Sequence, residues 1–168
     1  LTAHRAVRFK RRWRYAKHPL LGFVGIGDEA VEHGGGRARD FRERTGDLFL
    51  GDARLRCVWR RDRDGRVTRF TEEDQDLLGV VALAVDEPNR CLWVGLTALP
   101  EMEGYTSAAK GRAALVAFSL VNGEILRAID LPEDGRDHGV GALVVDPEGT
   151  LYATDSRSPV IWRVLPGA

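Results

Sequence analysis

The sequence predicts an all-β fold, a partial β-propeller, because it contains an internal repeat and because short apolar runs alternate with turn residues. Residues 48–60 align without a gap with residues 151–163, and in both copies one apolar run ends in Asp-x-Arg and a second ends in Trp-Arg. Residues 82–94 match residues 142–153, with one extra residue in the earlier turn. The unit therefore occurs three times, and repeats of roughly 40 to 50 residues built from short strands are typical of propeller blades.

The middle unit predicts one complete blade of four antiparallel strands, because turn residues separate its apolar runs. An Asn-Gly pair at 122–123, typical of a tight hairpin, joins the last two runs. The first unit predicts three such runs and a first strand near 37–43, and the last unit predicts three runs before the sequence ends. The expected strands lie at 47–51, 57–60 and 66–71, at 80–86, 91–96, 114–120 and 125–131, and at 140–146, 150–154 and 159–165. These strands amount to about two and a half four-stranded blades.

The beginning of the chain differs from the rest, and we expect a basic, irregular segment at 1–43 and the propeller fragment at 44–168. The first seventeen residues hold seven lysines and arginines and no acidic residue, although the whole chain has a net charge of zero. Five of the eight residues at 36–43, where the repeat would place a buried strand, are charged. We interpret this segment as sequence that is not native to a blade, translated out of frame or from a misplaced start.

Aromatic residues alternate with cations at 8–15, as in tails that bind nucleic acid. An ordinary basic tail is the favoured interpretation, so nucleic acid is not expected as a partner. No apolar run approaches the roughly 20 residues that span a bilayer, and no membrane partner is expected. The run at 20–26 is too short and too interrupted by glycine for a signal-peptide core, so the compartment is left open.

The number of blades has a consequence for assembly. A propeller closes with four to eight blades, and each blade buries its faces against neighbours on both sides. An open stack of fewer than three blades leaves two apolar faces uncovered. We therefore expect a fragment whose missing blades lie in sequence outside this chain, with self-association of copies into a ring as the alternative.

Two segments of the repeat resemble a known protein family. Residues 142–156 read Ala-Leu-Val-Val-Asp-Pro-Glu-Gly-Thr-Leu-Tyr-Ala-Thr-Asp-Ser, and residues 82–86 repeat the opening as Ala-Leu-Ala-Val-Asp. With them, the stretch at 46–167 resembles the senescence-marker-protein, gluconolactonase and luciferin-regenerating-enzyme family of six-bladed propellers. Propellers built from NHL repeats use a similar phrase. The resemblance implies a lactone or ester hydrolase acting on a small molecule, with calcium or zinc held in the central channel by a Glu and by Asn or Asp side chains.

The sequence departs from this family where the metal ligands belong. The family's ligating Asn corresponds to Gly141, the matching position at 80–83 offers no oxygen donor, and the family's early Glu-Gly-Pro phrase is absent. Calcium takes six to eight oxygen ligands and zinc about four, so calcium or zinc is implied by the resemblance but not supported by these residues. No metal ligand or catalytic residue is assigned. Two functions stay open: a lactone hydrolase whose ligands come from absent blades, and a non-catalytic NHL-type propeller that binds a ligand or a protein.

Propeller geometry places the candidate binding residues on one face. Loops that join the second strand of a blade to the third, and the fourth strand to the next blade, emerge together there. Three segments belong to this face: the repeated Asp-x-Arg loops, the long insertion at 97–112 and the connection at 132–139. Long irregular loops on a rigid scaffold are often functional. The candidates are Asp52, Arg54, Asp155, Arg157, Glu101, Glu103, Tyr105 and His138.

The repeated aspartates also have a structural interpretation, which we favour. Asp52 and Asp155, at strand ends, would accept hydrogen bonds from loop amides and fix the turn. Arg54 and Arg157 would then be paired or solvated, although an anion-binding role stays open. Repetition in two blades favours architecture over a single active site.

The remaining candidates have ordinary interpretations as well. His138 follows Asp137, whose carboxylate would raise its basicity, yet a lone loop histidine is ordinarily exposed. Glu101 and Glu103 could reach one cation, but two loop carboxylates are ordinarily solvated. Tyr105 either covers a ligand or pins its loop to the blade. Core or turn positions are expected for Trp59, Trp93, Trp162, Asp86 and Asp146, and buried free thiols for Cys57 and Cys91.

Overall fold

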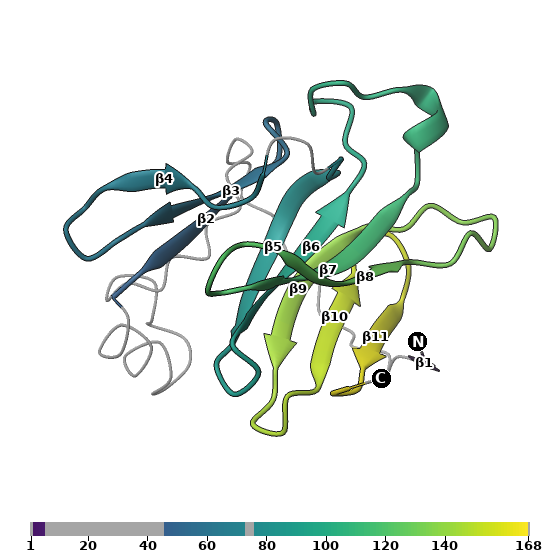
Figure 1. The fold of residues 1–168 in the computed structure, drawn as a ribbon. Helices are drawn as coiled ribbons and strands as arrows, with labels where there is room; N and C mark the ends of the chain where they lie inside the picture. The colour runs from purple at the N-terminus through teal and green to yellow at the C-terminus, as the bar shows by residue number, and fades with distance from the viewer. Residues whose placement is uncertain (1, 6–45, 73–75, 168) are drawn as a thin grey trace, which may run out of the picture.

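The computed structural model describes residues 2–5, 46–72 and 76–167, and the chain is all-β and folds as a partial β-propeller. Three antiparallel sheets follow one another (Figure 1), separated by loops and one short 3-10 turn, η1 (Ser107–Ala109). No helix in this part of the chain is long and apolar enough to cross a membrane. The repeat therefore predicted the fold class correctly.

Each sheet corresponds to one copy of the repeat. The first contains three strands in the order β2-β3-β4, the second four strands in the order β5-β6-β7-β8, and the third four strands in the order β1-β11-β10-β9. The bounds are β1 (Thr2–Arg5), β2 (Leu48–Asp52), β3 (Cys57–Arg61), β4 (Val67–Arg69), β5 (Gly79–Asp86), β6 (Cys91–Thr97), β7 (Ala113–Ser119), β8 (Ile125–Asp130), β9 (Val140–Val145), β10 (Leu151–Asp155) and β11 (Val160–Val164). The expected strands from 47 onward were thus correct to within a few residues.

The third sheet is completed from the other end of the chain. β1 pairs antiparallel with β11, in a register that sets Thr2 opposite Arg163 and Arg5 opposite Val160. This pairing was not predicted from the sequence, and three strands were expected here. The fourth strand thus comes from within the segment interpreted as not native to a blade. The first-sheet strand expected near 37–43 lies outside the described residues.

The middle sheet is buried on both faces. One core lies between the first and second sheets and includes Phe49, Val58, Leu92, Val94 and Phe118. A second core lies between the second and third sheets and includes Trp93, Leu115, Leu151, Trp162 and Val164. Because β6 contributes alternate side chains to each core, all seven of its residues are buried. Trp93 and Trp162 are core residues as expected, whereas Trp59 is half-buried.

Repeated glycines set the distance between neighbouring sheets. A Cβ added to Gly51 would lie 2.5 Å from Cγ1 of Val80, and one added to Gly95 would lie 2.4 Å from Cγ1 of Val140. Both glycines occupy the same position of the repeat, and both valines begin the inner strand of the next sheet. The third copy has Thr154 at the glycine position, where its Oγ1 accepts a hydrogen bond from the N–H of Ala142 at 2.8 Å.

Replacing Gly95 with alanine is expected to destabilise the chain by about 1 to 3 kcal/mol, the usual cost of overpacking a filled core. The added methyl group would push Val140 away from the second sheet. The free energy of unfolding, measured by chemical denaturation, checks this. In the double variant G95A/V140A the smaller side chain makes room, so its loss should be less than the sum of the two single losses. Additive losses would show that the two residues do not press on each other.

The turns and thiols follow the expectations. Asp86 Oδ1 accepts a hydrogen bond from the N–H of Asn89 at 3.1 Å, and Asp146 Oδ1 accepts one from Thr150 at 2.8 Å. Both aspartates therefore hold the turn that follows their strand. Cys57 and Cys91 are free and buried. Burial, and then the neighbouring Asp86, raise the pKa of Cys91 to about 12, so this thiol stays protonated near neutral pH.

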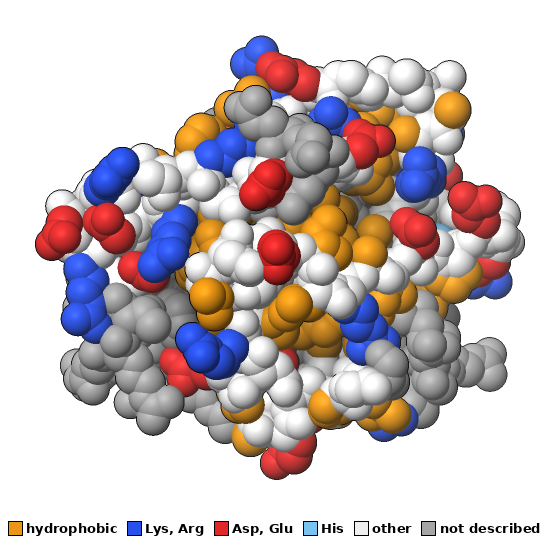
Figure 2. Space-filling model, in the orientation of Figure 1, with side chains coloured by type: hydrophobic (Ala, Val, Ile, Leu, Met, Phe, Trp, Pro, Cys, Tyr) orange, Lys and Arg blue, Asp and Glu red, His pale blue; other side chains and the backbone are white. Residues whose placement is uncertain are grey.

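The outward face of the third sheet is partly apolar. Val144, Tyr152 and Ile161 are 62%, 38% and 39% exposed, on the face opposite the second core. In the view of Figure 2, charged side chains surround apolar ones that gather over the middle of the molecule, where β5 to β9 lie in Figure 1. The described sheets thus leave apolar surface uncovered, as a propeller fragment would.

Candidate functional site

The loops predicted to share one face do meet. The N–H of Glu103 donates to the carbonyl of Arg54 at 2.9 Å, and Arg54 Nη2 lies 3.4 Å from Glu103 Oε1. The N–H of His138 donates to the carbonyl of Gly111 at 2.9 Å. The insertion therefore contacts the Asp-x-Arg loop of the first sheet on one side and the 132–139 connection on the other.

His138 and Asp155 form the centre of this face. Nδ1 of His138 lies 2.6 Å from Asp155 Oδ2, and Nε2 lies 3.1 Å from Asp134 Oδ1. The histidine side chain is 3% exposed and the Asp155 side chain 0%. The ring of Trp162 contacts the imidazole edge-on, with centroids 5.6 Å apart. The expectation of an exposed loop histidine is therefore wrong, and its partners are Asp155 and Asp134 rather than the adjacent Asp137.

Asp155 ties the loop to the sheet. Its Oδ1 accepts hydrogen bonds from the N–H groups of Gly139 at 3.2 Å, Arg157 at 2.9 Å and Ser158 at 3.1 Å. Its Oδ2 also accepts one from Nε1 of Trp162 at 3.4 Å. One carboxylate thus joins the start of β9, the turn after β10 and strand β11. The architectural interpretation of Asp155 is confirmed.

These contacts favour an ion pair at His138. Burial opposes the charged imidazolium, but the hydrogen bonds that its ring nitrogens donate to Asp155 and Asp134 outweigh burial and raise the pKa of His138. Burial likewise opposes the charged Asp155, yet the hydrogen bonds from His138 and from the N–H of Arg157 lower the pKa of that carboxyl. Partial desolvation opposes ionisation of Asp134 as well, but hydrogen bonds from Arg136 and His138 lower its pKa.

Asp52 holds the corresponding turn in the first sheet, but it is not part of a buried network like that of Asp155 and His138. Its Oδ1 accepts hydrogen bonds from the N–H groups of Arg54 at 3.0 Å and Leu55 at 2.8 Å, both at exposed positions. The expected turn role is therefore confirmed for Asp52 also. Arg54 pairs with Glu103 as described, and Arg157 Nη1 lies 3.9 Å from Asp137 Oδ2.

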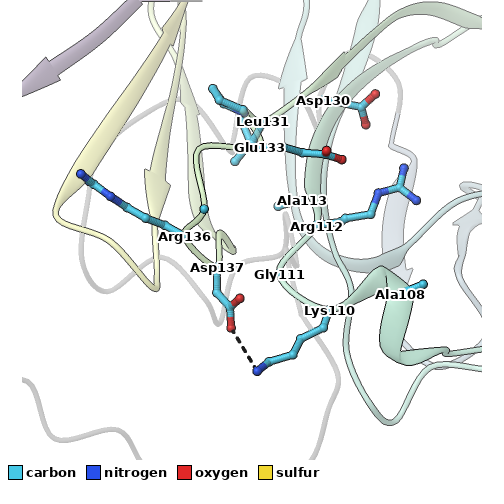
Figure 3. A pocket seen from close by; sticks show the side chains of 12 residues that line it. Ala108, Lys110, Gly111, Arg112, Ala113, Asp130, Leu131, Glu133, Arg136 and Asp137 are labelled. Atoms are coloured by element: carbon cyan, nitrogen blue, oxygen red, sulfur yellow. Dashed lines mark ion pairs between the residues drawn. The ribbon is translucent and has the colours of Figure 1, made fainter.

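A cavity of about 630 Å³ opens between the insertion and the connection, on the same face (Figure 3). Two hydrogen bonds hold its walls: the N–H of Ala98 donates to the carbonyl of Arg112, and the N–H of Leu131 to that of Ala113, both at 2.9 Å. The residues that line it are Ala108, Lys110, Gly111, Arg112, Ala113, Asp130, Leu131, Pro132, Glu133, Gly135, Arg136 and Asp137. Two of the three segments predicted for this face therefore line a space that could hold a ligand.

The cavity holds three cations and three carboxylates, and some of them are already paired. Lys110 Nζ lies 4.0 Å from Asp137 Oδ2, and Arg136 Nε lies 3.8 Å from Asp134 Oδ2, just outside the lining. Arg112, Asp130 and Glu133 have no ion-pair partner within the described ranges. In Figure 3 these three side chains occupy the same side of the cavity.

The individual candidates named from sequence flank this cavity and do not line it. Glu101 is exposed, Glu103 pairs with Arg54 and Tyr105 is half-buried, with its N–H bonded to the carbonyl of Met102. The buried side chain of Met102 anchors this part of the loop. Sequence reasoning named the two segments but missed Arg112, Asp130 and Glu133, which lie at strand ends and in the connection. Nothing in the residue pattern marked them apart from other surface charges.

The described residues do not fit the metal that the family resemblance implies. No group of three or more His, Cys, Asp or Glu residues among them could hold a metal ion. At Gly141, a Cβ would lie 2.7 Å from Oγ1 of Thr154, so a ligating side chain has no room there without a shift. The N–H of the neighbouring residue, Val140, donates a hydrogen bond to Oγ1 of Thr97 at 2.9 Å.

Comparison with known proteins identifies no family. A scan against protein-family models found no match, and a search of curated proteins found no match either. Among solved structures, the chain is similar to the extracellular domain of BT4673 of B. thetaiotaomicron, described as a one component system, with a TM-score of 0.44 and 16% identity. The similarity covers 70% of this chain and 13% of that one. The function of this chain is therefore inferred from its own residues.

Proposed function

We propose that this chain is a non-catalytic ligand-binding part of a propeller protein, and that it binds a small polar molecule in the loop-face cavity. The observation that carries the proposal is the cavity of about 630 Å³, which the insertion and the connection line and which is open to solvent, since most of its lining residues are exposed. Small-molecule sites usually measure about 300 to 1,000 Å³ and combine apolar walls with a few polar groups. Ala108 and Pro132 supply exposed apolar wall, and Arg112, Asp130 and Glu133 supply charge.

The chemistry of the face favours binding over catalysis. A general base needs a nitrogen or oxygen within reach of the substrate, and both ring nitrogens of His138 are engaged by carboxylates. The 3% exposure of its side chain leaves no access for a substrate. Cys57 and Cys91 are buried, so neither is a candidate nucleophile.

Blocking the cavity tests this proposal. A fragment library is screened by ligand-observed NMR against the wild-type chain and against A108W, which places an indole at an exposed lining position. Ligands should bind the wild type and lose at least tenfold in affinity in A108W. The control is S107W, at the exposed neighbouring position that does not line the cavity, and it should bind as the wild type does. Equal binding to all three chains would place the ligand elsewhere.

The lactone or ester hydrolysis implied by the family resemblance stays a prediction. It would need calcium or zinc ligands from blades outside the described residues, because these residues supply none. Addition of either metal to the purified chain is therefore expected to produce no lactone hydrolysis above the spontaneous rate.

Self-association is the partner proposal that the uncovered face supports. Val144, Tyr152 and Ile161 together expose apolar surface on the third sheet, and copies of the chain could bury it. We expect light scattering to give a mass that rises with protein concentration, and V144S/I161S to shift it toward the monomer. The control V67S removes an equally exposed valine from the first sheet. A monomeric wild type, or an equal effect of V67S, would contradict this.

A further inference from the structure

We propose that the ligand of the loop-face cavity is a small zwitterion of the amino acid class, whose carboxylate binds Arg112 and whose ammonium group binds Asp130 and Glu133. This inference rests on the proposed function and specifies its ligand. Of the six charged residues that line the cavity, Lys110 pairs with Asp137 at 4.0 Å and Arg136 pairs with Asp134, which lies just outside the lining. The three residues assigned to the ligand are exposed and have no such partner in the described part of the chain.

The backbone holds these three residues at defined positions. Arg112 directly precedes β7, and Asp130 ends β8, where it pairs in register with Ala114. The hydrogen bond from Ala98 to the Arg112 carbonyl and that from Leu131 to the Ala113 carbonyl fix the chain on either side. Glu133 follows two residues after Leu131, in the connection. Arg112 and Asp130 thus stand at the ends of a hydrogen-bonded sheet, which reduces the entropy lost on binding, whereas Glu133 lies in the connection.

The charges select the ligand. A guanidinium presents a planar fork of donors that matches a carboxylate, and two carboxylates can share the three N–H donors of an ammonium group. The sum for Arg112, Asp130 and Glu133 is one negative charge, so phosphate esters and dicarboxylates would meet more repulsion than attraction. A molecule with one carboxylate and one ammonium group satisfies both poles. Ala108 and Pro132 offer exposed surface for an aliphatic side chain.

Matched compounds test the zwitterion directly. Isothermal titration of the purified chain would compare L-leucine with 3-methylbutylamine, which lacks the carboxylate, and with 4-methylpentanoate, which lacks the ammonium group. We expect L-leucine or another amino acid of the common set to bind at least tenfold more tightly than its amine and acid analogues. An affinity for the acid or the amine equal to that for the amino acid would overturn the proposal.

Substitutions assign the two poles. R112Q should weaken amino acid binding at least tenfold, while leaving the weak binding of the amine unchanged. D130N/E133Q should weaken amino acid binding and leave, or improve, binding of the acid. The control R66Q removes the same charge at an exposed position in the turn after β3 and should have no effect.

The outcomes also separate this inference from the proposed function. If library compounds bind the wild type and fail with A108W, but no amino acid binds, the cavity is a binding site and the zwitterion assignment is wrong. If neither the library nor any amino acid binds, both proposals are wrong.

Discussion

Replacing Asp155 with alanine is expected to lower the free energy of unfolding by about 3 to 5 kcal/mol, the usual cost of removing one partner of a buried ion pair. The side chain is 0% exposed and accepts hydrogen bonds from His138, from three backbone N–H groups and from Trp162. Without the carboxylate, the buried donors of His138, Gly139 and Trp162 have no acceptor, whereas water can replace it for the partly buried N–H groups of Arg157 and Ser158. Urea denaturation followed by tryptophan fluorescence measures the loss.

The repeat supplies a matched control for this experiment. Asp52 ends β2 as Asp155 ends β10, but it accepts hydrogen bonds only from Arg54 and Leu55 at exposed positions. D52A should therefore cost about 1 kcal/mol or less, because water can replace the lost acceptor. Similar losses of unfolding free energy in D52A and D155A would show that the buried network around His138 adds no stability beyond that of the turn.

The network of His138, Asp155 and Asp134 is also expected to make stability depend on pH. Stability should be highest at mildly acidic pH and should fall as the pH is raised or lowered from there. The raised pKa of His138 contributes stability that is fully present below the unfolded-state pKa of about 6.5 and is lost as pH rises through the folded-state value. The lowered pKa values of Asp155 and Asp134 contribute stability present above about pH 4 and lost as pH falls further. A tenfold difference in proton affinity between the folded and unfolded states is worth about 1.4 kcal/mol.

Denaturation midpoints measured from pH 4 to pH 9 check this prediction. D134N, at a partly exposed position, removes one of the two carboxylates that face His138 and should flatten the decline above about pH 6.5 while the chain still folds. H138Q should abolish that decline, at a lower overall stability. A decline in H138Q as steep as in the wild type would assign the pH dependence to other groups.

The strands and the turn aspartates could be predicted because they depend on local sequence. Alternating apolar residues and turn signals are patterns that extend over about ten residues. These short patterns were enough to locate the strands from β2 to β11. The hydrogen bonds of Asp52, Asp86 and Asp146 connect residues within four positions of the aspartate. The shared loop face also followed, since it is a consequence of antiparallel strand order.

Contacts between distant residues could not be predicted in this way. His138 and Asp155 are separated by sixteen residues and meet only because β9 pairs with β10 and brings both loops to one end of the sheet. Arg112 is likewise distant in sequence from Asp130 and Glu133, and all three individually resemble ordinary surface charges. The burial of a loop side chain depends on which distant residues pack over the loop, and local sequence patterns do not show this.

Local sequence patterns were enough to predict an all-β chain of repeated strands, the turns between them and the face on which the long loops emerge. These local signals, hydrophobic period and turn residues, act over the length of one hairpin. Three features arise only when the sheets pack together: β1 completes the third sheet, His138 is buried between two carboxylates, and a cavity with unpaired charges opens beside it. These features depend on the docking of one sheet against the next, where space and burial are set by residues far apart in the chain.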